Sequence, residues 1–258
     1  YAEYVNKAPL QQGDTQFGEY PWQGAILKRE SREVIYVCGA ALVNDNHVLT
    51  AAHCVNGMNP HELKVRLGEW DVNRKTEFYD HIETNVNHIR IHPDFYPGTL
   101  TNDIAVLTLD ESVDFEANPH INPVCLPNSR SDFSNLHCYV TGWGKDAFGN
   151  EGDFQFILKE VEVPIWGLKG CESAMRKTRL GRSYKLDEGM LCAGGEEGKD
   201  ACKGDGGGPL VCQALDGSME LAGIVSWGIG CGERGIPGVY VNVPYYIDWI
   251  SKSIELTN

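Results

Sequence analysis

The chain has 258 residues, a formal net charge of −14 and nine cysteines, and it is 42% hydrophobic and 22% charged. This composition is that of a globular protein that buries a sizeable core, and the acidic balance excludes a general nucleic-acid-binding protein, which needs a basic surface. No apolar run approaches the roughly 20 residues that span a bilayer, so no membrane span is expected.

Residues 1–17 are polar and weakly periodic, which predicts an N-terminal arm or linker before one functional domain at residues 18–258. Along this domain, short β-branched and apolar runs alternate with turn-forming clusters. Predicted strands are 34–37, 40–43, 48–52, 63–67, 104–109, 139–141, 157–163, 210–212, 221–227 and 239–243. Many short strands at this spacing predict an all-β barrel or sandwich. Helical periodicity appears at 168–176 and again around 245–250.

The cysteines are dispersed along the domain. The closest two are ten positions apart, so the C-x-x-C spacing of zinc sites is absent. Dispersed cysteines at this density indicate disulfide bonds and an oxidising compartment. Their odd number leaves at least one thiol free or bonded to another chain.

Three segments carry candidate catalytic chemistry. Residues 49–54 place His53 at the end of a predicted strand, Asp103 directly precedes another strand, and 202–210 form a glycine loop. Taken singly, such a histidine is more often structural and such an aspartate is usually a turn or cap residue. Together, and in this chain order, the segments resemble the Ala-Ala-His-Cys, Asp-Ile-Ala and Gly-Asp-Ser-Gly-Gly-Pro motifs of the chymotrypsin-like serine proteases.

The resemblance extends through 18–22, 141–144, 226–228 and 237–240. It implies a trypsin-like fold of two six-stranded antiparallel β-barrels with a C-terminal α-helix. The disulfides it implies are Cys38–Cys54, Cys138–Cys212, Cys171–Cys192 and Cys202–Cys231. Cys125 is left over, at the position where family members with an N-terminal regulatory domain tether that domain.

The motif departs from the family at the nucleophile, where this chain has Gly206. In the triad, the imidazole takes a proton from a serine hydroxyl, and backbone N–H groups of the oxyanion loop, here Gly204, Asp205 and Gly206, receive the developing charge. Glycine offers no hydroxyl, so no acyl-enzyme can form. We therefore expect a pseudo-protease with no catalytic cofactor, in which His53 and Asp103 are vestigial.

The resemblance also bears on Asp205. Active members pair this aspartate with an Ile-Val-Gly-Gly-type terminus, and no such terminus is present in the sequence. Asp205 is therefore expected to lack its usual ion-pair partner. A buried unpaired carboxylate is costly, so the surrounding loops should either adopt a zymogen-like arrangement or supply another donor.

Asp200 matches the base of the specificity pocket of trypsin-like members, and Ser226, Gly228 and Gly238 belong to the same pocket remnant. A recessed carboxylate selects Arg or Lys. The pocket is therefore either a site that binds a basic side chain without cutting it or a collapsed relic.

Residues 67–77 resemble the family's calcium loop, with Glu69 and Glu77 as ligands, since oxygen ligands suit calcium. The alternative for this segment is a solvated charged loop.

Five cations lie within ten residues of this acidic chain: Arg176, Lys177, Arg179, Arg182 and Lys185. Such runs are usually solvated. Against the acidic background, this one could instead bind an acidic partner or be a site of proteolytic nicking.

The closest resemblance is to the clip-domain serine protease homologues of arthropods, suggested by Cys125 and by the stretches 67–71 and 193–200. It implies a secreted cofactor in a haemolymph-like fluid. Cleaved in an upstream clip domain that Cys125 retains, such a protein assists a clip-domain protease in activating prophenoloxidase during melanisation, with self-association after cleavage. Two alternatives stay open: an active trypsin-like endopeptidase with an engineered serine-to-glycine replacement at Gly206, and a non-immune adhesion or matrix-binding homologue.

Overall fold

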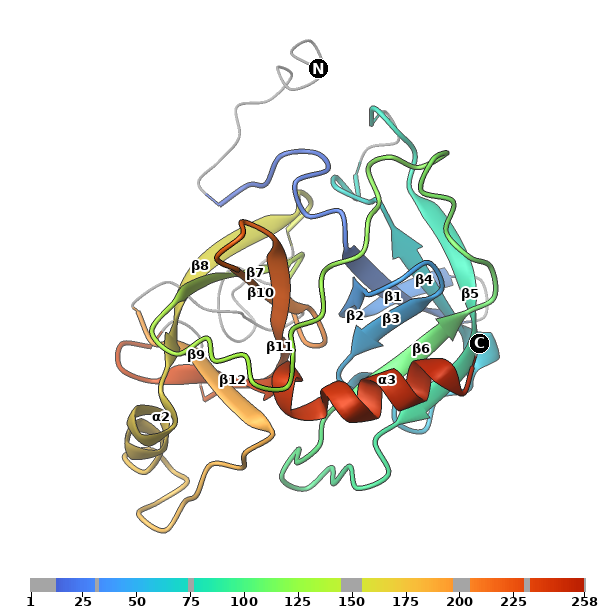
Figure 1. The fold of residues 1–258 in the computed structure, drawn as a ribbon. Helices are drawn as coiled ribbons and strands as arrows, with labels where there is room; N and C mark the ends of the chain where they lie inside the picture. Colours follow the sequence, from blue (N-terminus) through green and yellow to red (C-terminus); the bar gives the residue numbers. More distant parts are fainter. Residues whose placement is uncertain are drawn as a thin grey trace.

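The computed structural model describes residues 13–30, 33–73, 77–144, 155–196, 205–229 and 233–257. These residues form two closed antiparallel barrels that lie side by side (Figure 1). The first barrel contains β1 (Gln23–Glu30), β2 (Glu33–Leu42), β3 (His47–Thr50), β4 (Leu63–Leu67), β5 (Ile82–Ile91) and β6 (Ala105–Leu109). The second contains β7 (His137–Gly142), β8 (Lys159–Trp166), β9 (Met190–Gly194), β10 (Pro209–Gln213), β11 (Met219–Trp227) and β12 (Pro237–Asn242). The expected two six-stranded barrels are confirmed.

The strand order is β1-β2-β3-β6-β5-β4 in the first barrel and β10-β11-β12-β9-β8-β7 in the second. Strand β4 shows why such short segments form barrel walls. Leu63, Val65 and Leu67 are buried, whereas the intervening Lys64 and Arg66 are partly exposed. Alternation with a period of two directs one set of side chains into the barrel and the other outward.

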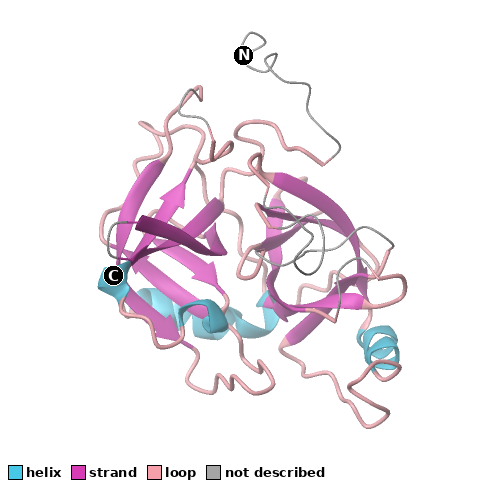
Figure 2. Ribbon diagram, turned by 180° about the vertical axis from the view of Figure 1, so that it is seen from behind, coloured by secondary structure: helices cyan, strands magenta, loops and turns pink. Residues whose placement is uncertain are grey.

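The helices lie at the edges of the barrels (Figure 2). They are α1 (Ala52–Val55), α2 (Leu168–Met175) and α3 (Ile247–Glu255), with 3-10 turns η1 (Pro60–Glu62) and η2 (Val243–Tyr246). The helix predicted at 168–176 is confirmed as α2. The C-terminal helix is also confirmed, but it begins at Ile247 and ends at Glu255. None of the helices in the described ranges is long and apolar enough to cross a membrane.

The first and last described segments of the chain contact different barrels. The N–H of Thr15 donates to the carbonyl of Leu158 (3.0 Å), next to β8 of the second barrel, and Asp14 pairs with Lys159 (2.5 Å). The C-terminal helix α3 instead contributes Ile250, which is fully buried, to the core that fills the first barrel. The described part of the predicted arm, residues 13–17, therefore lies against the protein rather than leading away from it.

Candidate functional site

The histidine and aspartate of the motif meet where β3 leads into α1. Nδ1 of His53 lies 2.7 Å from Oδ2 of Asp103, and the backbone N–H of His53 donates to Oδ1 at 2.7 Å. The Asp103 side chain is 1% exposed, whereas that of His53 is 31% exposed. The buried carboxylate therefore orients a partly exposed imidazole, as the triad geometry requires.

A third side chain completes this group from the second barrel. The hydroxyl of Ser226, in β11, donates to Oδ2 of Asp103 at 2.6 Å. The sequence predicts Ser226 as part of the specificity pocket, and that assignment stays a prediction; the structure adds that its hydroxyl is a partner of the buried aspartate. A further bond runs from the Tyr246 hydroxyl to Oδ1 of Asn102 (2.9 Å), beside Asp103. The site thus joins both barrels.

The glycine loop brings Gly206 to the other side of the imidazole. A Cβ added to Gly206 would lie 3.3 Å from Nε2 of His53. The loop is held in place because the carbonyl of Gly206 accepts from the N–H of Gly39 (2.9 Å) and the N–H of Gly207 donates to Val225 (2.8 Å). Position 206 therefore faces the histidine as the nucleophile position of the motif should, but it presents no side chain.

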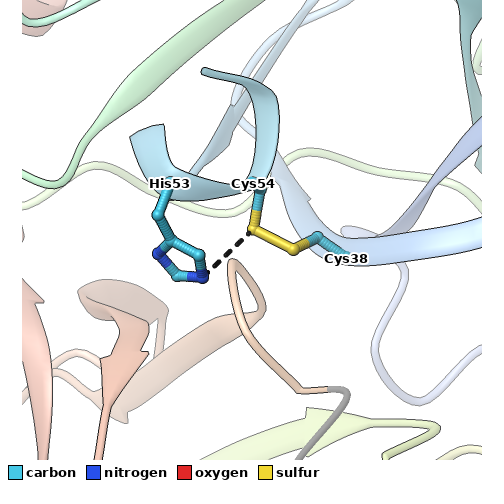
Figure 3. Close-up of side chains that lie close together, drawn as sticks. All are labelled: Cys38, His53 and Cys54. Atoms are coloured by element: carbon cyan, nitrogen blue, oxygen red, sulfur yellow. Dashed lines mark hydrogen bonds between the residues drawn. A yellow bond between two sulfur atoms is a disulfide. The ribbon is translucent and has the colours of Figure 1, made fainter. Parts of the chain in front are cut away.

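Cys38, His53 and Cys54 lie close together beneath this loop (Figure 3). The two cysteines form a disulfide, and the Cys54 sulfur lies 3.7 Å from Nε2 of His53. Zinc and similar metals bind cysteine as the thiolate, which a disulfide cannot provide. The cluster is therefore a structural support for the histidine and not a metal centre.

Asp205 has a hydrogen-bond donor. Its Oδ1 accepts from the backbone N–H of Gly144 at 2.8 Å. Gly142 and Gly144 make room for the carboxylate, since a Cβ at either position would lie 2.1 or 2.4 Å from Oδ1. Oδ1 of Asp205 thus has a backbone donor, as one of the two expected arrangements requires.

The pocket remnant is only partly covered by the structure. Asp200 and Gly204 lie outside the described residues, as does the predicted disulfide between Cys202 and Cys231. Gly228 is exposed just after β11, and Gly238 is buried within β12. Binding of a basic side chain in this pocket stays a prediction.

Three of the predicted disulfides are confirmed: Cys38–Cys54, Cys138–Cys212 and Cys171–Cys192. Cys125 has a free, exposed thiol. Its backbone is fixed to the second barrel, because its N–H donates to Met219 (3.2 Å) and its carbonyl accepts from Leu221 (2.9 Å). The thiol is thus accessible on a well-supported segment.

The two predicted calcium ligands converge on one backbone amide. Glu69 and Glu77 each accept from the N–H of Trp70 at 3.2 Å, and Glu77 also accepts from the N–H of Asp71 at 2.6 Å. Burial, together with the charge of Glu69, raises the pKa of Glu77 to about 7. A cation beside the pair would stabilise its ionised form, so these oxygen donors fit calcium.

Protein cations already contact one member of this pair. Glu69 pairs with Arg66 (2.8 Å) and with His81 (3.1 Å). Burial opposes ionisation of Glu69, but the hydrogen bonds and charges of His81 and Arg66 outweigh it and lower the pKa of Glu69. Residues 74–76 of this loop lie outside the described ranges. Calcium binding stays a prediction, in competition with Arg66 and His81.

The five cations of the predicted basic segment divide into two groups. Lys177, Arg179, Arg182 and Lys185 are exposed. Arg176 is half-buried, pairs with Glu172 and donates to a backbone carbonyl of its own loop. The sequence pattern treats the five alike, whereas the structure gives Arg176 a role within the loop.

The trypsin family model matches residues 11–250. The chain is 46% identical to phenoloxidase-activating factor 2 of Galleria mellonella, over 94% of this chain and 82% of that protein. It is 44% identical to inactive CLIP domain-containing serine protease A3 of Aedes aegypti, and this match covers 97% of this chain but 52% of that protein. Against inactive CLIP domain-containing serine protease A28 of Anopheles gambiae the identity is 41%, over 93% of this chain and 62% of that protein.

Proposed function

This chain belongs to the trypsin family and, within it, to the clip-domain serine protease homologues, and on that premise we propose that it is a catalytically inactive cofactor of prophenoloxidase activation. In this role it acts by binding proteins of an extracellular protease cascade that leads to melanisation. The names of the Galleria, Aedes and Anopheles relatives support both halves of the proposal, since one is a phenoloxidase-activating factor and two are inactive proteases.

The observation that carries the proposal is Gly206 opposite His53. An imidazole 3.3 Å from the place of a missing Cβ has no hydroxyl or thiol from which to take a proton. In subtilisin, removal of the serine alone costs a factor on the order of 10⁶ in turnover. Hydrolysis at this site is therefore negligible, and the protein acts by binding other proteins.

The retained His53 and Asp103 have a structural role in this proposal. Asp103 is buried, and its carboxylate depends on the amide and imidazole of His53 and on the Ser226 hydroxyl. Removing one hydrogen-bond donor from a buried carboxylate costs roughly 1.5–3 kcal/mol. The pair therefore stabilises the junction of the barrels without any catalytic step.

The partners we propose are an upstream clip domain, bonded through Cys125, and prophenoloxidase together with the clip-domain protease that activates it. The exposed thiol of Cys125 supports the first of these, because it can reach a cysteine of another segment. The disulfides of both barrels support secretion, since such bonds persist in oxidising compartments.

The test is a reconstituted mixture of prophenoloxidase and its activating protease, with and without the cleaved longer form of this protein. We expect phenoloxidase activity to rise only when this protein is present, while a peptide substrate of trypsin remains uncut by the protein alone. Absence of a rise would contradict the cofactor role and favour the adhesion or matrix-binding alternative.

A second measurement addresses the alternative of an inactivated enzyme. Gly206 lies outside the left-handed region of backbone conformation, so Gly206→Ser is compatible with the loop. We expect no turnover of an arginine-containing peptide by this variant, because the sequence also lacks the Ile-Val-Gly-Gly-type segment that active members pair with the aspartate of the glycine loop. Turnover at the rate of a trypsin-like enzyme would contradict this and show a protease that lacks only its nucleophile.

A further inference from the structure

The loop between α2 and β9 carries a concentration of unpaired positive charge. Lys177, Arg179, Arg182 and Lys185 are exposed, and none of the four makes an ion pair with any part of the chain that the structure describes. The loop projects from the outer end of the second barrel, away from the first barrel, in both views (Figures 1 and 2). We call residues 177–185 the basic loop.

Arg176 fixes the shape of the basic loop from within. Its Nε donates to the carbonyl of Tyr184 at 2.8 Å, and its Nη2 pairs with Oε1 of Glu172 at 2.5 Å. The other oxygen of Glu172 accepts from the N–H of Leu186 at 3.1 Å. One partly exposed ion pair thus ties the two ends of the loop to the last turn of α2.

Turns and apolar anchors hold the rest of the loop. The N–H of Gly181 donates to Thr178 and the N–H of Tyr184 donates to Gly181, each at 3.1 Å. Leu180 and Tyr184 pack on a buried cluster that includes Met175 and the Cys171–Cys192 disulfide. An ordered loop backbone, held by turns and apolar contacts, therefore carries the four cations.

This rigidity decides between the two roles predicted for the segment. A protease must draw several residues into an extended conformation, which here requires breaking the Arg176 contacts and both turns. A docking partner gains instead, because a preorganised surface loses less conformational freedom on binding. The structure thus favours docking over proteolytic nicking.

The charge of the remaining surface limits the length of the partner. The chain as a whole carries −14, so a long polyanion that reached beyond the basic loop would meet repulsion. A short run of carboxylates can contact the four cations without reaching the acidic surface beyond the basic loop. We propose that the basic loop docks a short acidic polypeptide segment of a partner protein. This inference rests on the binding role of the proposed function and names the surface that serves it.

The test is fluorescence anisotropy of a labelled peptide that contains six consecutive glutamates, at low and at moderate salt. The variant removes the four exposed cations: Lys177→Ala, Arg179→Ala, Arg182→Ala and Lys185→Ala. A matched control removes the same charge from exposed sites elsewhere: Arg29→Ala, Arg130→Ala, Arg234→Ala and Lys252→Ala. Each exposed ion pair changes affinity by a factor of roughly 1.5 to 5, so the loop variant, which loses four, should bind about fivefold or more weakly. The control should weaken binding less than about threefold, because distant charges are largely screened.

Two further measurements make the proposal specific. Arg176→Ala keeps all four exposed cations but releases the loop, and we expect it to weaken peptide binding severalfold. A heparin hexasaccharide should bind less tightly than the peptide. Equal weakening by the loop variant and its control would overturn the proposal, and so would tighter binding of the hexasaccharide, which would indicate a glycan site.

The same variants distinguish a failure here from a failure of the cofactor role. If the wild-type protein binds the peptide but does not raise phenoloxidase activity, the cofactor role is wrong and the docking surface stands. If the loop variant retains peptide binding, the docking surface is wrong whatever the phenoloxidase assay gives.

Discussion

Replacing Gly144 with alanine tests how the loop that carries Gly206 is held. A Cβ at Gly144 would lie 2.4 Å from Oδ1, 2.5 Å from Cγ and 2.6 Å from Oδ2 of Asp205. These distances force the carboxylate away and break the bond from the Gly144 N–H. Overpacking costs about 1–3 kcal/mol, and a lost hydrogen bond to a charged group about 1.5–3 kcal/mol. The reduced backbone entropy of the unfolded alanine chain offsets about 0.4–1 kcal/mol of this.

The net expectation is a loss of about 3 kcal/mol in the free energy of unfolding. In a chain of this size, that corresponds to a Tm lower by about 6–12 °C. Urea unfolding followed by circular dichroism measures the first quantity and a thermal melt the second. Gly170→Ala is the matched control. Gly170 lies within α2 and its Cβ would meet only the Trp166 ring, at an ordinary 3.6 Å, so this replacement should stabilise the protein by about 0.5–1 kcal/mol.

A double-mutant cycle with Asp205→Ala makes the reasoning refutable. The three atoms nearest to a Gly144 Cβ all belong to the Asp205 carboxylate, which alanine removes. In the Asp205→Ala background, Gly144→Ala should therefore be neutral or slightly stabilising, giving a coupling energy of at least about 2 kcal/mol, within the range for contacting residues. Equal destabilisation in both backgrounds would show that the carboxylate does not determine the need for glycine.

Three other measurements follow from the site. Ser226→Ala removes a donor from the buried Asp103 carboxylate and should lower the free energy of unfolding by about 1.5–3 kcal/mol; an unchanged urea midpoint would show that this bond contributes nothing. Millimolar calcium should raise the Tm of chelator-treated protein but not that of Glu77→Gln. An equal rise in both would place the cation elsewhere, and no rise would leave Arg66 and His81 as the partners of the acidic pair. In a longer form that includes the clip domain, the piece released by cleavage should stay attached until reduction, and Cys125→Ser should free it without reductant; detachment of the wild-type piece without reductant would refute the tether.

The fold was predictable where strands alternate clearly or are uniformly apolar. β4 alternates between buried and partly exposed residues, and β6 is buried throughout and apolar except for Thr108. Both strands were predicted. β5 was not, because Thr84 and Val86 are its only buried side chains and polar residues occupy both of its faces. β1 and β9 also lay outside the predicted runs. β9 is only five residues long and ends in Ala193 and Gly194, and its strand conformation comes from its pairing with β8 and β12.

The chemistry of the site was predictable from motifs, but its supporting contacts were not. His53, Asp103 and Gly206 lie in short recognisable segments. The bond from Ser226 to Asp103 joins residues 123 positions apart, and that from Gly144 to Asp205 joins residues 61 apart. No local pattern encodes such pairings, because the first exists only once the two barrels have packed and the second only once distant loops of the second barrel have met. At short range the same holds for Arg176. Its contacts with Glu172 and Tyr184 distinguish it from the exposed cations nearby, and the sequence pattern does not show this difference.

The segment before the first barrel contacts the second barrel, and the helix after the second barrel packs on the first. This arrangement has a consequence for how the molecule unfolds. The segment that precedes the first barrel is bonded to the second, through Asp14 and Thr15, and the helix that follows the second barrel fills the core of the first. Separating the barrels would break the contacts of Asp14 and Thr15 with the second barrel. It would also remove Ile250 from the core of the first barrel and expose it to water. The two halves therefore cannot melt one after the other as independent bodies. We therefore expect a single cooperative unfolding transition.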